Sequence, residues 1–150
     1  MRLFGDRFDI SSALSDLTRL HTELLPALLD ERSALAASDL NRLADVVTNK
    51  RALLEQLHAA TQHYDTATLE ARVNALPDDE RAVVGRRLND LRRLASEAQE
   101  SNRVNGKIVA RSQKSLSELA QLVLGEPVDQ LYGDRGEAKP LNRGGRVAKA

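Results

Sequence analysis

Side chains that could do chemistry are sparse in this 150-residue chain. The last two of its three histidines, His58 and His63, are five residues apart, whereas metal ligands on one helix face are about three or four apart. The third, His21, stands alone, and the chain has no cysteine for a thiolate nucleophile or a zinc site. We therefore predict no catalytic residue, no metal site and no cofactor.

The carboxylates show no pairing typical of general acid–base catalysis. They alternate with arginines, as in Asp30-Glu31-Arg32 and Asp78-Asp79-Glu80-Arg81, which is typical of solvated helix faces. Glycine motifs for phosphate binding or for a nucleophilic serine are absent from the sequence. The protein is predicted not to be an enzyme.

Basic residues gather in one stretch, which could in principle bind nucleic acid. They are Arg86, Arg87, Arg92, Arg93, Arg103, Lys107, Arg111 and Lys114. Acidic residues interrupt the stretch, no aromatic residue lies within it to stack on bases, and the whole chain has a net charge of zero. We interpret the stretch as a solvated face and predict no nucleic-acid partner.

Composition indicates which elements must carry any site. The chain has 25 leucines and only four aromatic residues, which favours packed amphipathic helices over sheet. The charged start of the sequence does not resemble a signal peptide, and no apolar stretch is long enough to span a membrane. We expect a cytoplasmic all-α protein without membrane insertion.

Apolar spacing and capping residues predict the helices. The first begins near Asp9, Ser11 or Ser12 and runs to about Ala36, with Pro26 as a kink. The second begins at Ser38 or Asp39 and ends around Tyr64, and a short helical piece lies between Thr66 and Leu76. Pro77 and the acidic residues after it introduce the last helix.

The last helix has the strongest pattern, an unbroken alternation of four- and three-residue steps that forms a heptad seam. The seam reads Val84, Leu88, Leu91, Ala95, Ala98, Asn102, Asn105, Val109, Ser112, Leu116, Leu119 and Val123. Leu122 and two other residues widen it, and Gly125 supplies the stop. An elongated bundle of three main helices is predicted, the third very long and coiled-coil-like.

The helix lengths do not match, and the mismatch suggests a function. The first two predicted helices are ~38 Å long and the last is ~70 Å. In an up-down-up arrangement the last helix would lack a partner beyond about residue 104, leaving an apolar stripe over 105–124. Two alternatives stay open: a break at Asn105-Gly106 with the chain folding back, or pairing of helices in a homodimer.

Two further segments stand out. The polar group Asn102, Asn105 and Gly106 interrupts the leucine-rich seam, and seam asparagines fix register at a cost in stability. After Gly125 the apolar period ends, and residues 125–150 hold five of the eight glycines. We interpret them as a flexible tail behind a domain of residues 1–124. Tyr132, beside apolar residues, is typical of either a docking peptide or a solvated turn.

These features together resemble the FlgN family of flagellar export chaperones. The first half carries Leu28-Leu29-Asp30-Glu31-Arg32 with Ala34-Leu35, then Asp39, Leu43, Lys50, Leu53-Leu54 and Leu57. The second half carries Asn102-x-x-Asn105-Gly106, Tyr132-Gly133-x-x-Gly136 and a basic end. The resemblance spans roughly residues 10–150, and Asp134-Arg135 departs from the turn expected between the tail glycines.

The resemblance implies a chaperone that binds the terminal helices of hook-filament junction proteins and delivers them to the type III export gate. It implies a client-binding region at the end of the long helix and the segment after it, which coincides with the predicted stripe. The expected client-binding residues are Val109, Ser112, Leu116, Leu119, Leu122, Val123, Val128 and Leu131. Tyr132, Gly133 and Gly136 are expected to dock on the export gate, and Asn102, Asn105 and Gly106 to be structural. The alternative from another class is a coiled-coil adaptor or homodimer without a client.

Overall fold

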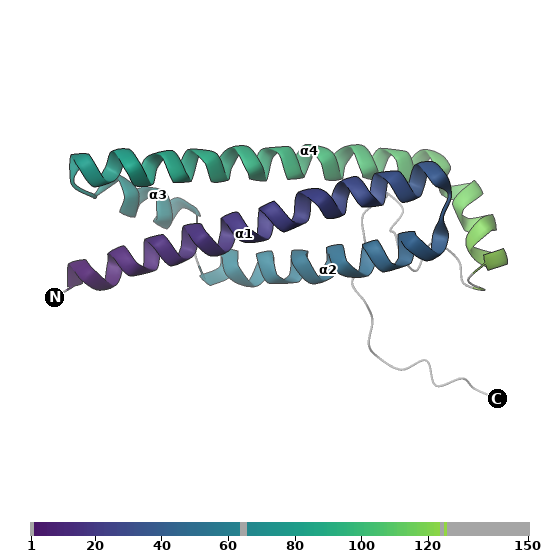
Figure 1. Ribbon diagram of the computed structural model, residues 1–150, viewed down its shortest axis with the longest axis horizontal. Coiled ribbons are helices and arrows are strands. Elements are labelled where there is room, and N and C mark those ends of the chain that lie inside the picture. Colours follow the sequence, from purple (N-terminus) through teal and green to yellow (C-terminus); the bar gives the residue numbers. More distant parts are fainter. Residues whose placement is uncertain (1, 64–65, 124, 126–150) are drawn as a thin grey trace, which may run out of the picture.

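Three long helices lie side by side in an elongated bundle (Figure 1). The computed structural model describes residues 2–63, 66–123 and 125. Its helices are α1 (Arg2–Ala37), α2 (Leu40–His63), α3 (Thr66–Asn74) and α4 (Asp78–Val123), and those residues contain no strand. The predicted all-α class with a very long last helix is confirmed. The predicted tail, apart from Gly125, lies outside the described residues.

The helix α1 begins earlier than its sequence predicts. Helical backbone extends to Arg2, through the proposed capping residues Asp9, Ser11 and Ser12, and Pro26 lies inside the helix. A serine or aspartate is a good cap only where the chain before it leaves the helix, and no proline interrupts residues 2–12. The prediction of a start near residue 9 was therefore wrong, while the end was placed within one residue.

A two-residue connection joins α1 to α2 and sets them antiparallel. Ser38 has φ of +52°, and the amide of Asp39 donates to the carbonyl of Ala34 at 3.0 Å, which is the usual C-terminal stop of a helix. The Asp39 carboxylate then accepts a hydrogen bond from the amide of Arg42 at 3.2 Å and caps α2. The predicted cap at Asp39 is confirmed, and the tight turn places both helices against each other.

The short helix α3 returns the chain to the end of the bundle where α1 begins, so α4 runs parallel to α1 (Figure 1). Side-chain contacts fix the register: Arg87 reaches Ser11 and Ser15, and Asn105 reaches Leu28. α1 lies between α2 and α4 and packs along both. The predicted up-down-up order is therefore correct, with α1 as the central helix.

The predicted overhang of α4 is not unpartnered. α4 is continuous through Gly106 and, beyond the end of α1, bends over the connection between α1 and α2 (Figure 1). We call residues 107–123 of α4 the terminal arm. Val109 and Leu116 of this arm are buried against that connection, which corrects the expectation of an exposed stripe over 105–124. Helix lengths alone do not reveal this contact, because α4 bends and is not straight.

Two apolar clusters form the core. The first cluster takes residues from all four helices, from Ile10 on α1 to Ala98 on α4. The second cluster lies at the other end, where the terminal arm covers the α1–α2 connection. Its buried members are Ala34, Leu35, Leu40, Leu43, Val47, Val109, Leu116 and Ala120. The terminal arm is therefore part of the fold and not an extension beyond it.

Candidate functional site

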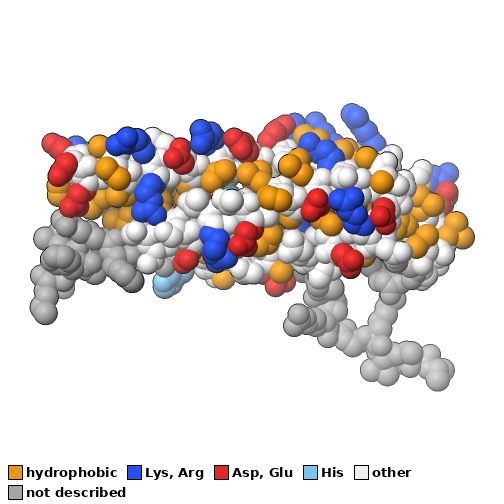
Figure 2. Space-filling model, in the orientation of Figure 1, with side chains coloured by type: hydrophobic (Ala, Val, Ile, Leu, Met, Phe, Trp, Pro, Cys, Tyr) orange, Lys and Arg blue, Asp and Glu red, His pale blue; other side chains and the backbone are white. Residues whose placement is uncertain are grey.

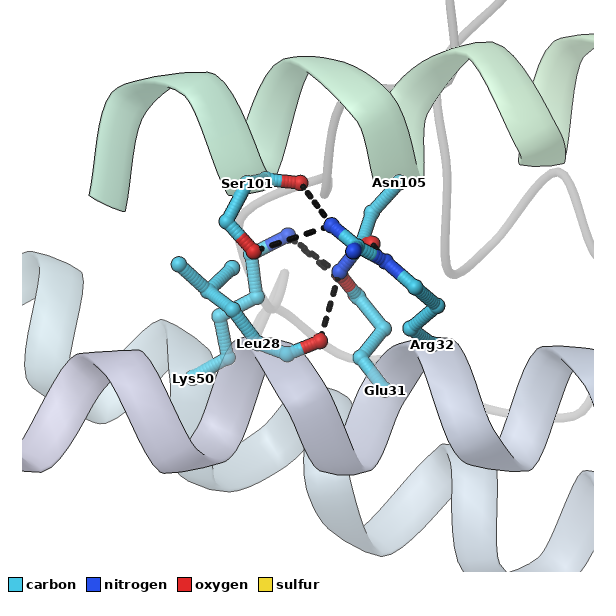
Figure 3. A network of polar contacts seen from close by, with 6 residues as sticks. All are labelled: Leu28, Glu31, Arg32, Lys50, Ser101 and Asn105. Carbon is cyan, nitrogen blue, oxygen red and sulfur yellow. Dashed lines mark hydrogen bonds and ion pairs between the residues drawn. The ribbon is translucent and has the colours of Figure 1, made fainter. Parts of the chain in front are cut away.

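Between the two clusters, a buried polar network joins α1, α2 and α4 (Figure 3). Glu31, Lys50 and Asn105 are each at most 2% exposed. The ammonium group of Lys50 lies 3.1 Å from both carboxylate oxygens of Glu31. The amide nitrogen of Asn105 donates to Glu31 at 2.7 Å and to the carbonyl of Leu28 at 2.8 Å. One carboxylate thus binds partners from both other long helices.

Arg32 extends the network toward the surface. Its Nε donates to the side-chain oxygen of Asn105 at 2.9 Å, and its Nη2 donates to the hydroxyl of Ser101 at 3.1 Å. The donor and acceptor ends of Asn105 are therefore both used. A buried carboxylate held by a lysine and an amide in this way has no exposed face for a substrate, so the arrangement fixes helix register and does no acid–base work.

The network lies where the core changes from one cluster to the other on each helix. On α1, Glu31 separates Leu28 of the first cluster from Ala34 of the second. On α2, Lys50 separates Leu53 from Val47 in the same way. Any one-turn shift of α4 would move Asn105 away from Glu31 and leave a buried charge under-satisfied. The network thereby sets where the terminal arm meets the α1–α2 connection.

The terminal arm presents two kinds of side chain. Val109 and Leu116 are buried in the second cluster, while Ser112 and Leu119 are half-buried and Leu119 packs against that cluster. At the end of the arm Leu122 and Val123 are 82% and 54% exposed. Apolar side chains gather at this end of the molecule (Figure 2, right). Of the predicted client-binding residues, only these last two are largely open to solvent; Val128 and Leu131 lie outside the described residues.

Most arginines of α4 are engaged with the protein itself. Arg92 pairs with Glu70 at 2.9 Å, Arg93 with Asp90 at 3.5 Å and Arg103 with Glu100 at 2.5 Å. Arg87 donates to Ser11 and Ser15 of α1. Over residues 87–103, these contacts fit the interpretation of the basic stretch as a solvated face with mixed charges.

A shallow groove of about 500 Å³ lies at the opposite end of the bundle. Its apolar lining is Ile10, Leu76, Val83 and Val84, with Asp79, Glu80 and Arg87 also bordering it. The sequence does not reveal this groove, because it forms where α1 meets the α3–α4 connection and no single helix pattern shows that contact. Among the described residues, no three His, Cys, Asp or Glu side chains lie close enough to hold a metal ion.

The sequence model of the FlgN protein family matches residues 1–140. The chain belongs to the FlgN family. Neither a curated protein nor a solved structure matches it. FlgN proteins are flagellar export chaperones, so the match gives the chain that general function.

The residues by which the sequence resembles FlgN proteins converge in the structure. Glu31 and Arg32 come from the first-half motif, Lys50 follows it, and Asn105 belongs to the polar group of α4; all four meet in the buried network. Asn102 is exposed and Gly106 half-buried, so of the three residues expected to be structural only Asn105 bridges helices.

A signal for this network existed in the sequence. Lys50 occupies the same helix face as Leu43, Val47 and Leu57, and Glu31 the same face as Leu28 and Leu35, so both charges interrupt apolar stripes. The expected gate-docking residues Tyr132, Gly133 and Gly136 lie outside the described residues. In the part of the chain that the structure describes, no helix combines the length and apolar character needed to cross a membrane.

Proposed function

We propose that this FlgN protein binds hook-filament junction proteins in the cytoplasm, prevents their self-association and delivers them to the flagellar type III export gate. The observation that carries the proposal is the family match over residues 1–140, which includes the whole terminal arm. The exposed end of that arm supplies a surface of suitable chemistry for the terminal helix of a client.

Client contact begins at the end of the terminal arm. Leu119, Leu122 and Val123 are spaced as one apolar face of a helix, and Leu122 and Val123 are exposed. An amphipathic client helix would pack its own apolar face against them, and Ser112, Val128 and Leu131 would extend the contact. Val109 and Leu116 would act indirectly, because they hold the arm against the α1–α2 connection.

Exposed apolar residues elsewhere on the protein provide a matched control. Leu29 on α1 and Val83 near the start of α4 are 58% and 55% exposed, and neither belongs to the terminal arm. The test compares the double variant Leu122→Ser and Val123→Ser with the double variant Leu29→Ser and Val83→Ser, which removes the same two residue types. Calorimetric titration with a purified junction protein should show at least about a tenfold weaker affinity for the first variant, or about 1.4 kcal/mol.

The control variant should bind the client within about twofold of the parent, since scattered surface positions contribute little. Equal affinity for both double variants and the parent would refute the terminal arm as the client surface. Sedimentation of the free protein tests the homodimer alternative in the same samples. A stable dimer that the first variant dissociates would favour an adaptor that pairs with itself.

Delivery to the gate is proposed to depend on Tyr132, flanked by Gly133. Truncating a central aromatic anchor costs about 2 kcal/mol or more, which corresponds to about thirtyfold in affinity. The variant Tyr132→Ala should therefore lose binding to the cytoplasmic domain of the export gate while it keeps its affinity for the junction protein. Unchanged gate affinity would contradict this role of Tyr132.

A further inference from the structure

Charge pairing on α4 differs between its two halves. Before residue 104, Arg81, Arg92, Arg93 and Arg103 each form an ion pair with an acidic residue. The pair with Arg103 lowers the pKa of the Glu100 carboxyl, chiefly through their hydrogen bond. The other two cations of this half, Arg86 and Arg87, donate hydrogen bonds to the Ala82 carbonyl and to Ser11 and Ser15, so four of the six cations on this half are paired with carboxylates.

The terminal arm carries three cations whose surroundings differ from those of the first half. Lys107, Arg111 and Lys114 are exposed, and their spacing of four and three residues places them on one helix face. None of the three forms an ion pair with a residue that the structure describes. Glu118 follows on the same face but lies beyond ion-pair distance of Lys114. We call Lys107, Arg111 and Lys114 the cation stripe.

The surface view shows the same contrast. Lys and Arg side chains gather along the upper edge over the second half of α4, whereas positive and negative groups alternate over the first half (Figure 2). The three cations outnumber the acidic groups beside them, which are Glu118 on the same face and Glu100, whose pKa Lys107 helps to lower. The face therefore keeps a net positive potential that attracts a carboxylate-rich segment. The stripe lies beside the second cluster, so an acidic segment bound there would lie along the terminal arm.

The chain supplies such a segment directly after α4. Gly125 has φ of +66°, a left-handed conformation that ends a helix and turns the chain away from its axis. The sequence then carries Glu126, Asp129, Asp134 and Glu137, with Arg135 as the single cation of residues 126–137. This segment therefore has the opposite charge to the stripe.

The reach of the segment suits the spacing of the stripe. Lys114 lies ~14 Å and Lys107 ~24 Å before Val123 along the helix axis, at 1.5 Å per residue. Extended chain covers about 3.3 Å per residue, so Asp129 can extend ~20 Å and Asp134 ~36 Å from Val123. Carboxylates of the segment can thus reach every cation of the stripe without displacing a helix.

We propose that residues 126–137 of this same chain dock back on the cation stripe, with their carboxylates against Lys107, Arg111 and Lys114. The contact holds the segment that contains Tyr132 alongside the terminal arm. Each exposed ion pair favours the docked state by only about two- to fivefold, so docking is reversible and sensitive to salt. The proposal concerns the free protein and does not depend on the client or the gate.

The absence of cysteine allows a clean test by nuclear magnetic resonance. A nitroxide attached at Ser115→Cys, an exposed position next to Lys114, should broaden the amide signals of residues 126–137 in the full-length protein at low salt. Signal intensity should fall at least about twofold and should recover in 0.5 M salt, where the Debye length is about 4 Å. A nitroxide at Ala82→Cys, an exposed position near the start of α4 and ~38 Å from Lys107 along the helix, should leave these signals unchanged.

Charge variants identify the contact. The triple change Lys107→Gln, Arg111→Gln and Lys114→Gln should restore the signals at low salt, with helicity checked by circular dichroism. The triple change of the same residues to Glu should do so as well, and adding Glu126→Lys, Asp129→Lys and Asp134→Lys to it should bring the broadening back. The matched control is Arg86→Glu, an exposed cation far from the stripe, and it should change nothing.

Three results would overturn the proposal. The first is no broadening from Ser115→Cys at low salt. The second is broadening that persists in the glutamine variant, which would show apolar docking in place of charge pairing. The third is broadening that arises only between molecules, detected by mixing nitroxide-labelled protein with isotope-labelled protein, which would show that the stripe binds a second copy.

Discussion

The two clusters of the bundle differ in what surrounds them. The first cluster has fifteen buried residues from four helices, and Arg92 and Arg93 of α4 above it pair with nearby acidic groups. The second cluster has eight buried residues, and its cover is the terminal arm, with the unpaired cation stripe and the exposed Leu122 and Val123. The first region pairs more of its surface charge within the fold, although its groove and the exposed Val83 leave apolar area there as well. The second region leaves cations together with two exposed apolar side chains at the end of a helix.

The largest expected effect comes from the polar network that separates the clusters. Lys50→Met would remove the ammonium group that pairs with the buried Glu31 carboxylate, which costs about 3–5 kcal/mol of unfolding free energy. Denaturant unfolding followed by circular dichroism measures this loss. Adding Glu31→Met should recover most of it, because a buried pair replaced by apolar side chains is often close to neutral. A loss below about 1 kcal/mol for Lys50→Met alone would show that the network does not hold the clusters together.

A smaller effect separates the two faces of the terminal arm. Leu116 is 3% exposed in the second cluster, so Leu116→Ala should cost about 2–5 kcal/mol and lower the melting temperature by several degrees. Leu122 is 82% exposed, so Leu122→Ala should shift the unfolding free energy by less than about 0.5 kcal/mol. If both variants melted like the parent, the arm would not be part of the core.

The smallest effect concerns the last paired cation before the stripe. Arg103 lowers the pKa of Glu100, so their pairing contributes to stability above the carboxyl's ordinary pKa and is lost as pH falls through the lowered value. In Arg103→Gln, a carboxyl titration by nuclear magnetic resonance should show the pKa of Glu100 moving up toward its ordinary value. An unchanged pKa would mean that Arg103 does not hold the Glu100 carboxylate in its charged form.

Local patterns in the sequence were sufficient for most of the fold. The cap at Asp39, the short helix before Pro77 and the acidic first turn of α4 each depend on residues within a few positions, and each is found as predicted. The early start of α1 was missed because a capping residue inside a helix looks the same in sequence as one at its end. The bend of α4 was missed because it depends on packing against the α1–α2 connection.

For the candidate site too, local patterns are visible in the sequence and long-range contacts are not. The sequence shows Glu31 and Lys50 interrupting apolar faces, yet their partnership joins positions 19 residues apart, and Asn105 lies 74 residues from Glu31. Only the folded bundle brings such positions together. The predicted apolar stripe over 105–124 does contain the exposed Leu122 and Val123. The burial of Val109 and Leu116 could not be inferred from heptad spacing, because a seam residue can pack against a partner or in the protein's own core.

Amide hydrogen exchange along α4, with and without a junction protein, tests the central claim that partners act at the terminal arm and not over the first cluster. Exchange reports the local stability of each hydrogen-bonded turn. We expect the client to slow exchange at residues 115–123 and to leave residues 84–98 unchanged. Added protection over residues 84–98, or none anywhere in α4, would contradict the account.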